Sequence, residues 1–444
     1  MAIGRIKVQC FQGESYIPVD GAKVTIRPSG GNAQARTNFR ADLITDSSGV
    51  TEPIEVDAPP IEYSQNPSNN APYSLYDIRV EKDGFEEVSI RNVQVFPERT
   101  ALQNVNLNQS FNTRASRAEV IVILPNTLFG NYPGKIPENP DKPLPLPSSG
   151  VVLAKPVIPE FITVHQGSPN DNTAPNYTVD YKDYIKNVAS CEIYSTWPES
   201  TIRANIFCII SFTLNRIYTE WYKGKGKNFD ITSSTAYDHA FNYGRNIYDS
   251  ISAVVDEIFS TYIRRFGRKQ PLLAQYCDGK NVTCPQWLSQ WGSKYLGDQG
   301  KVPYEILTYY YGDDIELTTA EQVKGSPSSY PGFDLDIGSS GEPVRMVQQF
   351  LNRIAQNYPL IPKVAIDGQY GSSTAEQVKV FQSIFNLPQT GVVDYATWYK
   401  ISDVYVGVTK IAELRSENVF YPPGAKTGYR GIETPSFHYP TDFL

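Results

Sequence analysis

Glu192 is the residue of this chain best placed for acid–base chemistry. Tyr181, Tyr184, Ile185 and Val188 form a stripe at helical spacing, and Glu192 falls on the same face, four residues after Val188. Burial and the negative end of a helix dipole both raise the pKa of a carboxyl group. A carboxyl that stays protonated near neutral pH can act as a general acid. By this pattern alone, however, a glutamate that turns to solvent at a fraying helix end is the more common outcome.

The next segment must position this glutamate and is expected to be a second helix. Thr196 is a potential N-cap, Pro198 suits the first turn, and Glu199 stands at the capping-box position. Because capping explains Glu199, we expect its replacement to cost stability more than activity. Further helices are expected over about 244–266 and 303–311.

Composition sets limits on the function. The chain has 444 residues, which predicts two to four domains. It carries 40 Lys and Arg against 47 Asp and Glu, and this net charge of −7 argues against nucleic acid as the main partner. No apolar run is long enough to span a bilayer, and the N-terminus lacks the pattern of a secretory signal.

Cysteine and histidine are scarce. Of five Cys, Cys277 and Cys284 are close enough in sequence to pair, or they are two small buried thiols. The three His stand beside no Cys pair and in no recognisable hydrolase motif, so neither a metal nor another cofactor is expected.

The chain divides into segments of different character. Alternating apolar segments with turn signals up to about residue 110 predict a β-sandwich, and a Pro-rich run follows at 131–150. The N-terminal pattern resembles the transthyretin-like, carboxypeptidase-regulatory sandwiches. The expected fold class is multidomain α+β, with a β-sandwich, a mixed but helix-rich central domain and a three-helix C-terminal domain. The expected divisions are 1–115, 116–159 (strand and linker), 160–320, 321–335 (linker), 336–403 and 404–444 (tail).

Two motifs carry a family resemblance. The segment YKDYIKNVASCEIYSTWPESTIRANIFCIISFTLNRIY (181–218) and the segment LSQWGSKYLGDQGKVPYEILTYYYG (288–312) resemble the stage II sporulation protein D-like lytic transglycosylases. Within that family the chain is most similar to the clostridial spore cortex-lytic enzymes. The V-x-x-E match implies that Glu192 is catalytic. The resemblance also implies substrate-binding residues near it, namely Ser289, Gln290, Trp291, Tyr194, Trp197 and Arg203.

The resemblance implies a reaction that needs one carboxyl group instead of the usual pair of a glycosidase. Glu192 would protonate the glycosidic oxygen between N-acetylmuramic acid and N-acetylglucosamine. The resulting carboxylate would then take the proton of the muramoyl 6-hydroxyl, giving a 1,6-anhydromuramoyl end. Some relatives have a Cys/His zinc cluster between the two motifs, but residues 229–241 contain no Cys, so no structural zinc is expected.

The C-terminal segment resembles the peptidoglycan-binding domain 1 repeat. Val344, Val347, Leu351, Val378 and Phe381 are its expected core positions, and a glycine-containing turn at 367–371 precedes its second helix. This resemblance implies peptidoglycan as the partner and leaves open which feature of the wall is bound.

The layout resembles that of a zymogen. The resemblance implies that a subtilisin-like germination protease removes the N-terminal region, and we expect cleavage between about Pro147 and Glu160, with Ser149, Gly150, Val151 and Val152 the favoured positions. It also implies a location in the spore, in the cortex or coat region. Two alternatives stay open: an N-acetylmuramoyl-L-alanine amidase, and a non-catalytic wall-binding protein.

Overall fold

A computed structural model describes residues 2–13, 16–30, 39–110, 119–139 and 155–417, with side chains to residue 409. Eight α-helices and several sheets lie in this part of the chain, which confirms the mixed α+β class. The chain has an N-terminal, a central and a C-terminal region, and buried side chains from all three join in one apolar cluster. None of the described helices is long and apolar enough to cross a membrane.

The N-terminal region is built on two sheets of five strands each, and one of these strands, β13, comes from the central region. Strand β1 (Ala2–Gln12) buries every second side chain, among them Ile6, Val8 and Cys10. The first sheet has the order β13-β8-β1-β2, with β5 also paired to β1, and the second has the order β4-β3-β6-β7-β9. The other strand bounds are β2 Ile17–Pro18, β3 Lys23–Pro28, β4 Ala41–Ile44, β5 Ile54–Ala58, β6 Ser74–Glu81, β7 Val88–Val95, β8 Thr100–Asn106, β9 Glu119–Val122 and β13 Ile247–Tyr248.

The central region is built around the long helix α2 (Glu199–Tyr218), which is buried along most of its length. Helices α1, α3, α4 and α5 pack against α2. Their bounds are α1 Tyr181–Glu192, α3 Asp249–Ile258, α4 Gln290–Asp298 and α5 Pro303–Tyr311. Small sheets complete the region: β10 Phe161–His165 with β11 Asn176–Asp180 and β12 Ile231–Thr232, β14 Thr261–Arg265 with β17 Ile315–Thr319, and β15 Tyr276–Cys277 with β16 Leu288–Ser289.

The C-terminal region contains the helices α6 (Glu342–Ile354), α7 (Ser372–Ile384) and α8 (Tyr395–Glu417). The expected core positions Val344, Val347, Leu351, Val378 and Phe381 are all buried. Gly368, in the turn before α7, has a φ of +72°, which favours glycine. Helix α8 runs on to residue 417, past the boundary that we expected at residue 403.

Two local expectations are wrong. The helix expected over about 244–266 is shorter, because 261–265 forms strand β14, whose aromatic and β-branched residues pair with β17. Thr196 does not cap α2: its hydroxyl donates to the Ser64 hydroxyl (2.7 Å), and the carboxylate of Glu199 binds Arg203 instead of closing a capping box. The helices expected at 181–192 and 303–311 are confirmed.

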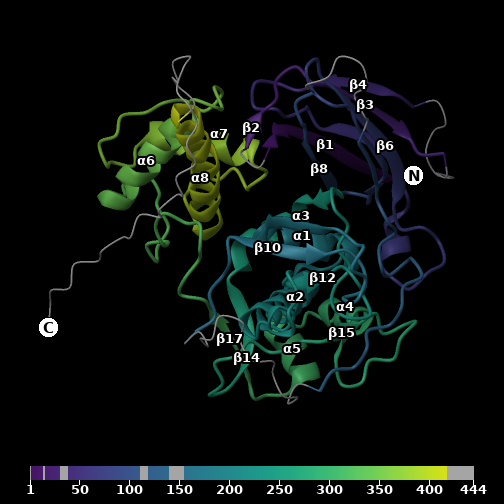
Figure 1. The fold of residues 1–444 in the computed structure, drawn as a ribbon. Helices are drawn as coiled ribbons and strands as arrows, with labels where there is room; N and C mark the ends of the chain where they lie inside the picture. Colours follow the sequence, from purple (N-terminus) through teal and green to yellow (C-terminus); the bar gives the residue numbers. More distant parts are fainter. Residues whose placement is uncertain (1, 14–15, 31–38, 111–118, 140–154, 418–444) are drawn as a thin grey trace, which may run out of the picture.

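The three regions contact one another (Figure 1). Strand β13 of the central region adds to the N-terminal sheet beside β8. The C-terminal region is joined to α1 by a Lys182–Asp403 ion pair. It also meets the N-terminal region, where the Lys7 ammonium donates to the side-chain oxygen of Asn386 (2.8 Å). The N-terminal and C-terminal regions therefore both pack against the central region that carries Glu192.

Candidate functional site

Glu192 is the last residue of α1, and its position follows from how α1 is held. The Asp180 side chain caps the helix by accepting from two backbone amides of the first turn. A buried ion pair between Lys186 and Asp256 (2.8 Å) joins α1 to α3. The apolar stripe faces the core, and Glu192 is only 3% exposed. The expectation from the helix pattern alone, a glutamate turned to solvent, is therefore wrong.

Both carboxyl oxygens of Glu192 are engaged. Oε1 accepts from the backbone N–H of Ala240 (2.6 Å), and Oε2 accepts from the Tyr276 hydroxyl. Burial raises the pKa of Glu192 to about 6, although the Lys135 charge and the two hydrogen bonds oppose this shift. A carboxyl with this pKa exchanges its proton close to neutral pH, as an acid–base catalyst must.

Tyr276 is held by an aromatic stack. Its ring lies parallel to that of His239, with centroids 5.8 Å apart, and His239 Nδ1 is 3.0 Å from the Tyr184 hydroxyl. Burial raises the pKa of Tyr276 above its ordinary value, so the phenol stays protonated and donates to Glu192. Sequence analysis did not identify Tyr276 or His239, because neither stands in a motif; only their contact in the fold reveals them.

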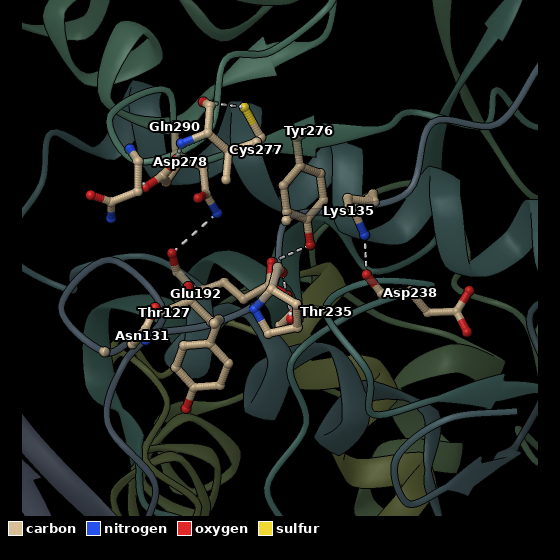
Figure 2. Close-up of a pocket in the computed structure, with 16 residues that line it drawn as sticks. Thr127, Asn131, Lys135, Glu192, Thr235, Asp238, Tyr276, Cys277, Asp278 and Gln290 are labelled. Atoms are coloured by element: carbon tan, nitrogen blue, oxygen red, sulfur yellow. Dashed lines mark hydrogen bonds between the residues drawn. The ribbon is translucent and has the colours of Figure 1, made fainter. Parts of the chain in front are cut away.

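A cavity of about 90 Å³ opens at Glu192. Its other lining residues are Thr127, Gly130, Asn131, Tyr132, Pro133, Gly134, Lys135, Thr235, Asp238, Tyr276, Cys277, Asp278, Asn281, Val282 and Gln290 (Figure 2). Two of them, Asp238 and Asp278, are further carboxylates. Their hydrogen bonds decide whether either is free to act beside Glu192.

Both carboxyl oxygens of Asp238 accept hydrogen bonds from neighbouring side chains. Its Oδ1 accepts from Arg216 Nε (2.7 Å), and its Oδ2 accepts from the Tyr222 hydroxyl (2.7 Å) and the Thr232 hydroxyl (2.7 Å). These hydrogen bonds engage both oxygens of Asp238 and hold Arg216, Tyr222 and Thr232 in place.

Asp278 is also occupied, by the turn that follows it. Its carboxylate accepts from the backbone N–H groups of Asn281 and Val282, both at 2.9 Å. Cys277 and Cys284, whose pairing the sequence left open, form a disulfide across the same turn. Asp278, like Asp238, is therefore held by structural hydrogen bonds, whereas burial raises the pKa of Glu192.

The residues named from the second motif lie in different places. Gln290 lines the cavity, and its side-chain amide donates to the backbone oxygen of Glu192 (3.1 Å; Figure 2). Ser289 caps α4 by accepting from the N–H of Gly292 (3.0 Å). Trp291 is buried outside the cavity lining.

The residues named near the first motif do not line the cavity. Tyr194 and Trp197 are buried in an aromatic cluster with Trp291, where the Trp197 and Trp291 rings have centroids 5.0 Å apart. Arg203 forms ion pairs with Glu199 and Glu257. The favoured cleavage positions Ser149, Gly150, Val151 and Val152 lie outside the described residues.

No group of three or more His, Cys, Asp or Glu side chains in the described ranges is arranged to hold a metal ion.

Comparison with known protein families gives a match for the C-terminal region. Residues 340–401 match the PG_binding_1 family of peptidoglycan-binding domains. The search of curated proteins finds no match. Solved structures with local similarity include the SleB N-terminal domain (25% identity, 17% of this chain and 99% of that one, TM-score 0.16) and the Bacillus anthracis TIE protein (13%, 24% and 17%, TM-score 0.18). Wild-type Acinetobacter radioresistens catechol 1,2-dioxygenase overlaps 27% of this chain and 57% of its own at 14% identity and a TM-score of 0.19. At such TM-scores these overlaps define neither fold nor function.

Proposed function

We propose that this chain is a spore cortex-lytic enzyme made as a zymogen, a lytic transglycosylase that cleaves the bond between N-acetylmuramic acid and N-acetylglucosamine during germination. The match of residues 340–401 supports the coarser statement that the protein is associated with peptidoglycan. The finer assignment depends on Glu192 and its surroundings.

One observation carries the proposal. Glu192 is a buried carboxyl with a pKa raised to about 6, it lines a cavity, and the other two carboxylates of that cavity are held by structural hydrogen bonds. A glycosidase of the usual type places two carboxyl groups at a fixed separation and activates water with one of them. A lytic transglycosylase needs only one, because its nucleophile is a hydroxyl of the substrate.

In the proposed reaction, protonated Glu192 gives its proton to the glycosidic oxygen while the bond from that oxygen to muramoyl C1 breaks. The Glu192 carboxylate then accepts the proton of the muramoyl 6-hydroxyl as O6 bonds to C1. The products are a free 4-hydroxyl on N-acetylglucosamine and a 1,6-anhydromuramoyl end, and Glu192 is protonated again. Tyr276 and the Ala240 amide hold the side chain of Glu192 and stabilise its carboxylate between the two proton transfers.

The N-terminal sheets form the pro-region, residues 160–320 the catalytic domain, and residues 336–403 the wall-binding domain. A subtilisin-like protease of the germinating spore cuts near Ser149–Val152, and the enzyme acts in the cortex or coat region.

The test is digestion of purified cortex in water enriched in oxygen-18. The enzyme is the full chain with a site-specific protease sequence inserted between Gly150 and Val151, cut at that site and separated from its N-terminal fragment. A transglycosylase gives anhydromuramoyl ends without oxygen-18, because water takes no part. Labelled reducing ends would show a hydrolase, freed stem peptides an amidase, and no soluble fragments a non-catalytic wall-binding protein; each of these contradicts the proposal.

A further inference from the structure

Residues 126–138, which we call the cleft segment, follow the last strand of the N-terminal sheets and pass beside Glu192. Thr127 and the consecutive residues 130–135 line the cavity together with Glu192, Tyr276 and Gln290 (Figure 2). The remaining space of about 90 Å³ is well below the roughly 300–1,000 Å³ of ordinary ligand pockets. The cleft segment therefore takes up room that a saccharide would need.

The start of the cleft segment is bonded to the end of α1. The Asn126 side-chain amide donates to the backbone oxygens of Ser190 (3.2 Å) and Ile193 (3.1 Å), on either side of Glu192. Asn126 is fully buried. The Thr127 N–H donates to the backbone oxygen of Cys191 (2.9 Å), so the segment is fixed in register beside the candidate acid.

The end of the cleft segment is bonded to three further segments of the central region. The Ile136 N–H donates to the backbone oxygen of Ala236 (2.7 Å). The Gln275 side chain exchanges two hydrogen bonds with the backbone of Glu138 (3.0 and 2.9 Å). The Glu138 carboxylate forms a bidentate ion pair with buried Arg216, which is a strong geometry for such a pair.

Lys135 is the residue of the cleft segment whose charge acts on the candidate acid, and both line the cavity. Its ammonium group donates to the backbone oxygen of Asp238 and lies 4.7 Å from the Phe212 ring centroid and 5.2 Å from that of Tyr276 (Figure 2). Its positive charge lowers the pKa of Glu192 and so favours the carboxylate. That is the wrong protonation state for a general acid, so Lys135 opposes the first step as well as filling space.

Further N-terminal residues cover the aromatic cluster. Trp197 Nε1 donates to the backbone oxygen of Ser64 (2.9 Å), and the Phe96 ring packs on Tyr194 with centroids 5.2 Å apart. Strand β13 is hydrogen-bonded into the N-terminal sheet. None of these contacts is broken by a cut at 149–152.

We propose, on the basis of the proposed function, that the cleft segment is an intramolecular inhibitor. Residues 126–138 occupy the saccharide cleft, Lys135 fills part of the cavity at Glu192, and the N-terminal region keeps inhibiting after the activating cut until it dissociates. The cut is thus necessary but releases no activity by itself.

The test uses the full chain with the site-specific cut after Gly150, in the Glu192→Gln background, so that saccharide binding is measured without turnover. The probe is a soluble tetrasaccharide of alternating N-acetylglucosamine and N-acetylmuramic acid, followed by calorimetry. Lys135→Ala shortens the blocking side chain, and Lys135→Met removes its charge at nearly constant length, which keeps the test valid if the alanine variant folds poorly. Lys23→Ala, an exposed lysine of β3, is the matched control.

We expect the two fragments of the cut parent to co-elute in gel filtration and to bind the tetrasaccharide at least tenfold more weakly than the cut Lys135→Ala protein. Lys23→Ala should match the parent. Tight binding by the cut parent while its fragments still co-elute would overturn the inhibitor. If Lys135→Ala improves binding but the same variant with Glu192 restored cleaves no glycan, the inhibitor stands and the proposed reaction fails.

Discussion

Two glutamates seven residues apart, at the end of α1 and the start of α2, have opposite surroundings. Glu192 is 3% exposed, has both oxygens hydrogen-bonded and has a pKa raised to about 6 by burial. The Glu199 side chain is 68% exposed and pairs with Arg203 one turn further on. The difference shows that the fold around a carboxyl group, and not its place at a helix end, decides whether that group is buried and what it bonds to.

The largest expected effect is that of Glu192→Gln on activity. Glutamine keeps the shape of the side chain but has no proton to give, so the rate of glycan cleavage should fall about 10²–10⁴-fold. The measurement is the release of soluble saccharide from cortex by the cut and dissociated enzyme. A loss below about tenfold would remove Glu192 from the reaction.

Tyr276→Phe should have the next largest effect, about a tenfold loss of rate, because it removes a hydrogen bond to a charged group. That hydrogen bond lowers the pKa of Glu192, so its loss raises this pKa further. Activity that needs protonated Glu192 falls as the pH rises through the pKa, and the alkaline limb of the pH–rate profile should therefore move to higher pH. An unchanged limb would mean that Tyr276 has only a packing role.

The raised pKa of Glu192 also predicts a stability effect. The folded pKa of about 6 exceeds the ordinary value of 4.5, so this group lowers stability as the pH rises from about 4.5 to 6, and the whole penalty remains above pH 6. A shift of this size corresponds to about 2 kcal/mol. The test compares the free energy of unfolding of Glu192→Gln with that of the parent at pH 4 and at pH 7.5. Between these two pH values the difference should change in favour of the variant by up to about 2 kcal/mol. Denaturant unfolding at the two pH values checks this, and a difference independent of pH would contradict it.

Glu199→Gln should have the smallest effect. An exposed pair one helical turn apart contributes about 0.3–0.5 kcal/mol, so unfolding should shift by no more than that and activity should stay within about twofold. A large loss of activity would mean that the two carboxyl groups work together and that the single-carboxyl account is incomplete.

Helical periodicity was enough to predict α1 and the face on which Glu192 lies, because these follow from residues close in sequence. The burial of Glu192 did not follow, since it depends on the segments around Ala240 and Tyr276, which lie 48 and 84 residues further along the chain. Thr196 illustrates the same limit: it has the sequence context of a cap, but a long-range contact with Ser64 takes its hydroxyl. Lys135 lies in a Pro-rich run that offers no periodic pattern, so only the fold shows that it reaches the cavity.

The most direct test of the central claim, that Glu192 alone carries transglycosylation, is mass spectrometry of cortex digested to completion. The cut and dissociated parent would be compared with its Glu192→Gln and Glu199→Gln variants. We predict 1,6-anhydromuramoyl ends from the parent and from Glu199→Gln, and none from Glu192→Gln. Anhydromuramoyl ends from Glu192→Gln in the parent's amount would contradict the account.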